Sequence, residues 1–580
     1  MKYKLLAASI LATISTSALS ATYQLTELGS FDEAKHSYVT DVSENGHMIG
    51  LVNGLYNLPI DVSYIDFTDS LIESAYRERE EYFKQIKKEI SFTLDDIQNK
   101  NAAATNSDAH SFMLSFLTNK QATNSEYQKL ANLAAIRFSE DGSPAQEQVF
   151  FDIGSVDFSG LTRSTSNIYN AIADDGVSVG WGSAPYEKVL FTPDGQDKEE
   201  THFEREFISR GVVISDSGVA FPLFPDFDEY GGISSAGDIV KTNSGYTVVG
   251  QVSTGIPEDR QENIDDNCDG EDELISVCIE NIHRSSSSQL FDLRAVKWKL
   301  DSSLNIVDTE ILGLGLTPDE DEGAAFISNA VGVNKNGIAV GYSSVRYVKD
   351  SDTILSLPVY FKDGNVTEIV DQEDDWFGGK AISINENDVI VGYATKYIEG
   401  ASRFKFFYHD IASGSTVFPT DYFNSSSSFA NDINDNGYIV GEGETDVFNV
   451  GSRRREGFLY KIGEDSITNL NDLLPCYEED GETRYKYVVS EAKSINNNNE
   501  IFGVATKTVE KTDTLGGVVT DINGDIEYES VSVAVKLTPI DGEVDSCTDP
   551  ETETYERQSA SFPWYTLLLL PLVGLRRVFR

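Results

Sequence analysis

The stretch that decides the fold is residues 430–441, which read ANDINDNGYIVG. Two apolar residues, Ala430 and Ile433, enclose two polar ones and lead into the polar turn at 434–437. Apolar residues and the closing Gly441 follow that turn. Asn, Asp and Gly tolerate the positive φ that tight hairpin turns require, and the β-branched pair Ile439 and Val440 suits a strand. The stretch therefore predicts a β-hairpin.

Seven copies of this pattern occur along the chain, with closing glycines at positions 50, 180, 250, 341, 392, 441 and 503. We expect these glycines to permit a close approach of backbones. A second hairpin follows most copies, and its first strand is expected at residues 135–138, 189–191, 359–361 and 457–460. Two hairpins give four strands, which is the content of one propeller blade.

The spacing of the closing glycines predicts two insertions. Successive gaps are 130, 70, 91, 51, 49 and 62 residues, against roughly 40–50 residues for known propeller blades. Residues 54–132 show helical periodicity, with a capping box expected at Ser70 to Glu73 and a second short helix at Ser125 to Ala134. Residues 253–290 are polar and acidic, and we interpret them as a loop pinned by a disulfide.

The repeats predict an all-β fold, a seven-bladed β-propeller over residues 22–550 with a helical insertion in the first blade. A ring of blades leaves no exposed sheet edge. Thr22 to Leu28 is expected to add a strand to the last blade near Val531 to Leu537 and so to close the ring. A β-solenoid or two stacked β domains is the alternative architecture.

Both ends of the sequence resemble targeting segments. Residues 1–21 carry Lys2 and Lys4, a short apolar run and the stretch Ala18-Leu19-Ser20 with small residues at its first and last positions, which is typical of a secretory signal peptide. After a linker at 551–561, residues 562–580 combine an apolar run with arginines, but the run is shorter than the ~20 residues of a spanning helix. We expect export to the periplasm or the outer cell surface. The tail leaves two fates open, cleavage or retention as a membrane anchor.

The charge of the chain excludes some partners. The sequence has 45 basic and 95 acidic residues, a net charge of −50. Such a surface repels phosphate backbones and anionic lipid headgroups. We therefore expect no nucleic-acid partner, and contact with a membrane only through the C-terminal tail.

The cysteines predict two disulfides. An exported protein with an even number of cysteines favours disulfide pairing, and the sequence contains Cys268, Cys278, Cys476 and Cys547. Three pairings are possible. We favour Cys268 with Cys278 inside the second insertion, which leaves Cys476 with Cys547.

Calcium is the one candidate cofactor. Asp265, Asn267 and Asp269 stand at alternate positions before a glycine, as in a calcium loop, although Ser276 and not Glu occupies the twelfth position. The run of residues 432–437 in the sixth repeat also matches half of such a loop. Because it has no acidic residue at the twelfth position, we interpret it as a hairpin turn stabilised by Asn side chains.

Catalytic motifs are missing from the sequence. It contains no clustered histidines, no GxSxG nucleophile elbow and no Walker loop. We therefore predict a non-catalytic binding or scaffold protein of the cell envelope, with an unknown protein or glycan as its partner. The alternative is a hydrolase of extracellular polymers that uses carboxylates in the propeller channel.

The repeat at 430–441 and its relatives that close at Gly341 and Gly392 resemble the HAF-type repeats of exported bacterial proteins. Together with the signal-like start, the run Leu58 to Asp61 and the apolar, arginine-bearing tail, the sequence resembles the exported domain-of-unknown-function family 3466 of Gram-negative bacteria. This family has no assigned activity, so the resemblance implies export and no particular chemistry. The tail is similar to the GlyGly-CTERM sorting signal, except that residues 559–561 are Ser, Ala and Ser where paired glycines are expected.

Overall fold

The computed structural model describes residues 22–121, 124–285, 290–319, 322–447, 453–479, 482–484 and 486–542. Strands dominate these residues and helices are few, so the predicted all-β class is confirmed. The expected signal peptide, linker and tail lie outside the described residues. Within those residues, no helix combines the length and the apolar character needed to cross a membrane.

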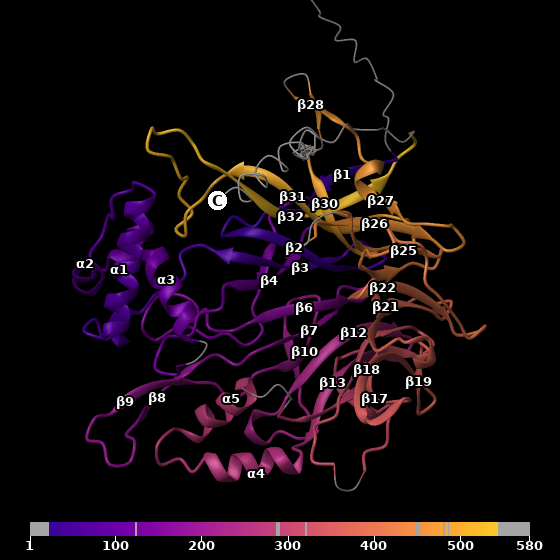
Figure 1. Cartoon of the computed structure of the whole chain (residues 1–580), viewed down its shortest axis with the longest axis horizontal. Helices are drawn as coiled ribbons and strands as arrows, with labels where there is room; N and C mark the ends of the chain where they lie inside the picture. The colour runs from indigo at the N-terminus through magenta and orange to yellow at the C-terminus, as the bar shows by residue number, and fades with distance from the viewer. Residues whose placement is uncertain are drawn as a thin grey trace, which may run out of the picture.

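Antiparallel four-stranded sheets make up most of the structure (Figure 1). In the described ranges there are five such sheets, one sheet of eight strands and two isolated hairpins. The five sheets consist of β2 (Ala34–Val42), β3 (Met48–Leu55), β4 (Leu133–Phe138) and β5 (Gln146–Gln148); β6 (Asn167–Ile172), β7 (Ser178–Gly182), β10 (Arg210–Ile214) and β11 (Ala220–Leu223); β12 (Ser234–Thr242), β13 (Gly245–Gly255), β14 (Asp292–Leu300) and β15 (Ile306–Gly313); β24 (Ser428–Ile433), β25 (Tyr438–Glu444), β26 (Arg455–Lys461) and β27 (Thr468–Asn469); and β30 (Val488–Ile495), β31 (Ile501–Glu510), β32 (Tyr528–Pro539) and β1 (Tyr23–Glu27).

The eight-stranded sheet holds the fourth and fifth repeats. Its two halves meet only through one parallel pair, Ser356 with Gly378. One half contains β16 (Ser328–Val333), β17 (Ala339–Tyr347), β18 (Asp350–Lys362) and β19 (Asn365–Glu368), and the other contains β20 (Gly378–Ile384), β21 (Val389–Ile398), β22 (Ala401–Asp410) and β23 (Ser415–Val417). Each half thus has the same four-strand order as the other repeats.

The two ends of the described chain share a sheet. Strand β1 pairs antiparallel with β32, with Leu25 opposite Leu537. This pairing confirms the strand that the sequence predicted at Thr22 to Leu28. The first strands of the repeats also contact one another in order: β2 with β6, then β12, β16, β20, β24 and β30, and β30 with β2.

A bulge at one fixed position explains the closing glycines. In the fourth repeat Ala330 pairs with Gly341 and Gly332 with Val340, so Val331 has no partner in the ladder. The same register shift occurs in the first strand of all seven repeats. A Cβ on each closing glycine would lie only 1.9–2.2 Å from a carbonyl oxygen of the first strand. The expected close backbone approach is therefore confirmed.

The hydrophobic core lies between neighbouring sheets. Phe406 of β22 and Phe458 of β26 are fully buried with ring centroids 4.9 Å apart, and they belong to one cluster that joins the fifth and sixth repeats. Full burial of one such side chain stabilises the fold by about 1.5–3 kcal/mol. Packing between sheets therefore holds the repeats together.

The first insertion is helical, and its details correct the sequence prediction. Helices α1 (Ser70–Gln85), α2 (Leu94–Lys100) and α3 (Ser107–Gln121) lie between β3 and β4 and group beside the sheets (Figure 1). The N-cap of α1 is Asp69, so the capping box expected at Ser70 to Glu73 is wrong; the observed box joins Thr93 and Asp96. The helix expected at Ser125 to Ala134 is also wrong, because Leu133 already begins β4, whose following residues are buried in the first sheet.

The strand expected at 189–191 has a different place from the one predicted. Strand β8 (Glu187–Phe191) pairs with β9 (Glu200–Glu204) in a hairpin outside the second sheet. The third strand of that sheet is β10, all five of whose residues are buried, whereas β8 is largely exposed or half-buried. Strand β10 therefore forms the third strand of this sheet, because its residues are buried there and those of β8 are not.

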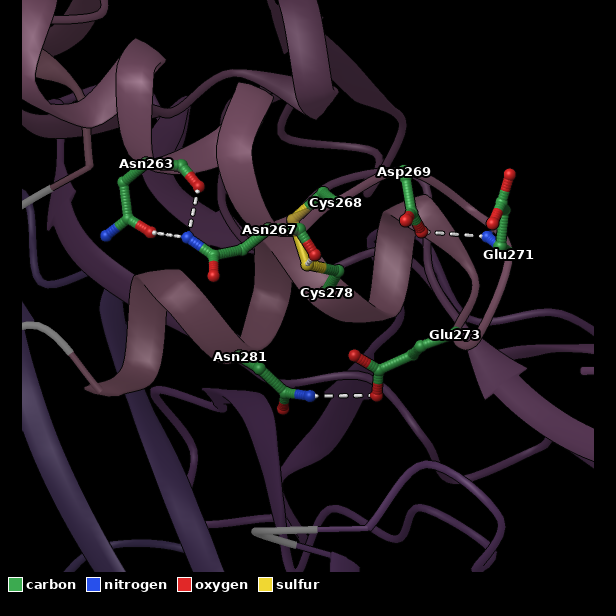
Figure 2. The surroundings of a disulfide bond; sticks show 8 residues. All are labelled: Asn263, Asn267, Cys268, Asp269, Glu271, Glu273, Cys278 and Asn281. Carbon is green, nitrogen blue, oxygen red and sulfur yellow. Dashed lines mark hydrogen bonds between the residues drawn. A yellow bond between two sulfur atoms is a disulfide. The ribbon is translucent and has the colours of Figure 1, made fainter.

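The second insertion is a pair of helices and not a loop. Helices α4 (Glu258–Asn267) and α5 (Ile275–Ser285) lie between β13 and β14. The predicted bond between Cys268 and Cys278 is confirmed and joins the end of α4 to α5 (Figure 2). Cys476 is also disulfide-bonded, and its expected partner Cys547 lies outside the described residues.

Candidate functional site

All seven repeats line one small pocket of about 190 Å³ where their first strands end. We call it the central pocket. The residue that follows the bulge in each repeat lies at or near it; in chain order these residues are Asp41, Ala171, Asp238, Gly332, Ser383, Asp432 and Ser494. Three carboxyl groups and two hydroxyl groups thus gather at one level of the structure.

Each of the three aspartates binds the backbone of the next repeat. The amide of Ile172 donates to Asp41 at 2.9 Å, and the amide of Val333 donates to Asp238 at 2.7 Å. The amide of Ile495 donates in the same way to Asp432 at 2.9 Å. These hydrogen bonds connect adjacent sheets, so each of the three carboxyl groups has a structural role.

The surrounding repeats desolvate these carboxyl groups. Burial raises the pKa of Asp41 well above its ordinary value and also raises the pKa of Asp432. Burial raises the pKa of Asp238 to about 7. Loss of solvent disfavours the charged form of a carboxyl group, so these groups take up a proton more readily than exposed aspartates.

The hydrogen bonds around Ser494 indicate that Asp41 carries a proton. The Ser494 hydroxyl lies 3.1 Å from Asp41 Oδ1 and 3.0 Å from Asp432 Oδ2. A hydroxyl has one proton and donates to one acceptor only. Asp432 accepts further bonds from the amides of Ile433 and Ile495 and from the Ser383 hydroxyl, an arrangement that suits an ionised carboxylate. Asp41 is then the group placed to donate its own proton to Ser494.

The polar turns form a second set of contacts around the same pocket. The amide of the second turn residue in one repeat donates to the side chain of the second turn residue in the next. This series runs from Lys335 to Glu386, Asp435, Asn497, Glu44 and Asp174. Asn434 accepts from the amide of Tyr438 and donates to the carbonyl of Asn496. The interpretation of residues 432–437 as a turn stabilised by Asn side chains is confirmed.

The calcium candidates of the second insertion do not form a loop. Asp265 and Asn267 lie in α4, and the Asn267 amide group donates to Asn263, one turn earlier (Figure 2). Asp269 accepts from the amide of Glu271. The described residues contain no group of three or more His, Cys, Asp or Glu side chains arranged to hold a metal. The alternate spacing was wrongly interpreted as a loop, because the helix continues through Asn267; calcium binding itself stays a prediction.

A larger cavity of about 730 Å³ lies away from the central pocket. We call it the side cleft. The base of the β8–β9 hairpin, the turn at Glu229–Gly231 and α5 form its walls, and the hairpin and α5 lie close together in Figure 1. Arg205 donates to Glu280 across it at 2.9 Å. Sequence reasoning missed this cavity because its walls come from separate segments that share no local motif.

Known proteins resemble this chain only distantly. No curated relative matches the sequence. The β-propeller domain of the Trilobed protease from Pyrococcus furiosus is 9% identical, with a TM-score of 0.31 over 70% of this chain and 90% of that one. The acylaminoacyl peptidase of Pyrococcus horikoshii is 11% identical, with a TM-score of 0.34 over 90% of this chain and 54% of that one. At these values the likeness carries no statement about activity.

The family comparison covers nearly the whole chain. Residues 1–578 match the family described as "Protein of unknown function (DUF3466)". The repeats, the pairing of β1 with β32 and both insertions all fall inside the matched range. This chain belongs to the DUF3466 family.

Proposed function

We propose that this chain is an exported seven-bladed β-propeller that serves as a non-catalytic binding scaffold of the cell envelope. Seven repeats with one strand order, the contact series of their first strands and the pairing of β1 with β32 support the closed ring. A signal-like start and a sorting-like tail in the sequence support export, with the tail as the only membrane contact.

The use of the central carboxyl groups is the observation that carries this proposal. Asp41, Asp238 and Asp432 all bind the backbone of a neighbouring repeat. Groups that join sheets are poor candidates for proton transfer to a substrate, which needs a carboxyl group within reach of the reacting atoms. The central pocket is therefore interpreted as structural.

The binding surface is assigned to the opposite end of the sheets. The turn between the first and second strands lies at the central pocket, so the loop between the second and third strands leaves from the other end. Helices α1–α3, the β8–β9 hairpin and helices α4–α5 are all inserted in that loop. Functional residues concentrate in loops that a rigid scaffold positions, so we expect a protein or glycan partner there.

Photo-crosslinking in expressing cells tests this assignment. A photoreactive amino acid at Leu190 of β8 or Tyr82 of α1, which are 62% and 51% exposed, is expected to capture a specific partner. The control position is Asn336, in a turn at the other end of the sheets. Capture from Asn336 alone, or from none of the three positions, contradicts the proposal.

Fractionation of cells that express the protein with and without residues 559–580 tests the role of the tail. If both forms appear in the same soluble fraction, the proposed sorting role is contradicted.

A hydrolase is the second candidate, and one observation favours it. Glu204, Glu280 and Arg205 line the side cleft together, and paired carboxylates serve as acid and base in polymer hydrolysis. Glu204→Gln and Glu280→Gln should then abolish turnover of chromogenic glycosides or fluorogenic peptides by the purified protein. If the wild type has no such turnover, this second candidate is excluded for those substrates.

A further inference from the structure

We infer that the side cleft binds a basic peptide segment of a partner protein, with the apolar residues of that segment on the cleft floor and its Lys or Arg side chains at an acidic rim. This inference rests on the proposed binding function and adds the chemistry of the partner. It follows from the apolar lining, the distribution of charge around the cleft and the unusual pairing of like charges on one of its walls.

The cleft exposes large apolar side chains. Ile153, Tyr230 and Ile275 are 46%, 41% and 47% exposed, and all three line the same cavity. Phe207 and Phe151 line the same cavity and pack edge to face, with ring centroids 5.3 Å apart. Exposed apolar side chains that gather in one concave place, rimmed by polar groups, mark interaction sites. A ligand for this cleft therefore has an apolar part.

The rim carries more negative than positive charge, with four glutamates and one arginine, Arg205, among its residues. Glu280 is paired with Arg205 and Arg284. Within the part of the chain that the structure describes, no ion pair joins Glu187, Glu204 or Glu206 to a basic side chain, although burial lowers the pKa of Arg210 and the nearby charge of Glu206 opposes that shift. Among side chains, Glu204 accepts only from the Ser276 hydroxyl. Three carboxylates at a partly enclosed surface attract a cation more strongly than the same charges spread over open surface.

One pair of these glutamates opposes the stability of its own hairpin. Glu187 and Glu204 are direct partners in the β8–β9 ladder, and like charges directly opposite in antiparallel strands are destabilising. Glu206 follows two residues after Glu204 and lines the same cavity. A lysine or arginine placed between these carboxylates removes the repulsion.

The insertion disulfide gives the cleft a fixed wall. Ile275, Ser276, Ile279 and Glu280 of α5 line the cavity, and Cys278 of the same helix is bonded to Cys268. A cross-link of this kind restricts the helix before any ligand arrives, and a preorganised site loses less conformational freedom on binding. The acidic insertion is thus a structural part of the binding site.

A peptide titration of the purified protein tests the inference. The probes are two fluorescent, amidated octapeptides, one of alternating Lys and Leu and the other of alternating Glu and Leu. The wild type is expected to bind the Lys–Leu peptide, more weakly as salt increases, and not the Glu–Leu peptide. Replacing all three rim carboxylates (Glu187→Gln, Glu204→Gln, Glu206→Gln) should weaken binding roughly tenfold, since each exposed ion pair contributes modestly. Tyr230→Ala should also weaken it.

The matched control removes three acidic charges from the second insertion, which also borders the cleft, at positions that do not line it: Glu262→Gln, Asp266→Asn and Asp272→Asn. This control should keep the affinity of the wild type, and thermal unfolding checks that both triple variants are folded. Equal loss of affinity in both variants, equal binding of the two peptides, or no binding by the wild type overturns the inference. The crosslinking experiment does not depend on ligand charge, so it still reports on the proposed binding function when the peptide result is negative.

Discussion

Replacing Asp238 with Asn should change the stability of the protein by an amount that depends on pH. Asp238 accepts the amide of Val333 on Oδ2 and the amide of Ile239 on Oδ1, both at 2.7 Å. In the protonated carboxyl group both oxygens, including the hydroxyl oxygen, still have a lone pair for these two donors, whereas an Asn side chain offers one acceptor oxygen and its amino group then faces a backbone N–H donor. Leaving such a donor unpaired costs about 1–3 kcal/mol. At acidic pH the variant is therefore expected to be less stable than the wild type.

The sign of the pH effect follows from the raised pKa. The pKa of Asp238 is about 7 in the folded chain against 3.8 as its ordinary value, chiefly because of burial. Its stabilising contribution is complete below about pH 3.8 and is lost as the pH rises through about 7. Between pH 5 and the folded pKa of about 7, the free energy of unfolding of the wild type falls by about 1.4 kcal/mol per pH unit. Its total loss between pH 5 and pH 8 is therefore at most roughly 3 kcal/mol. Asn does not titrate, so the deficit of the variant shrinks by up to this amount.

Urea unfolding followed by tryptophan fluorescence at pH 5 and pH 8 measures the difference between the two proteins. The expected result is a clear deficit for the variant at pH 5 and little deficit, or a reversal, at pH 8. The exposed variant Asp272→Asn serves as the control and should show no such trend. A deficit that stays constant over this pH range would refute the reasoning, because Asp238 would then titrate as an ordinary carboxyl group.

Three further outcomes are expected. Gly341→Ala should destabilise the protein by more than about 3 kcal/mol, because its Cβ would meet a backbone oxygen at 1.9 Å, whereas Gly255→Ala, with open space around it, should cost about 1 kcal/mol or less. At pH 7, Asp41→Asn should lower the free energy of unfolding, measured with urea, by about 1–3 kcal/mol less than Asp432→Asn does. The reason is that an amide at position 41 can donate to Ser494, whereas the side chain at position 432 only accepts hydrogen bonds. Equal losses in the two variants would contradict the proton assigned to Asp41. If calcium binds the second insertion, chelation should lower the thermal midpoint, and an unchanged midpoint ends that hypothesis.

The hairpin of each repeat was predictable from sequence because its determinants are local. Turn residues such as those at 434–437 and the closing Gly441 lie within one short run, and the structure uses each where the pattern places it. The pairing of β1 with β32 was predictable for a different reason: the ring expected from the repeats would need a strand at its open edge. The seven closing glycines share one cause, the bulge opposite them, although the pattern alone did not reveal it.

The cleft and the gathering of carboxyl groups could not be predicted, because both depend on contacts distant in sequence. Asp41 and Asp432 meet at Ser494 only after the repeats have come together. The apolar run of β8 is typical of a strand, so the sequence predicted it as part of the sheet. Strand β10 occupies that place instead, because more of its residues are buried there. The helix in the second insertion was missed because acidic residues with alternate spacing also suit a loop.

Strand β1 has a consequence for how the molecule assembles. Its partners lie at residues 535–539, so nearly the whole polypeptide must be available before the last sheet can acquire its fourth strand. Contacts between such remote segments form late, since a long loop has to close first. A chain truncated before β32 would therefore leave β31 with an unpaired edge, and such edges promote aggregation.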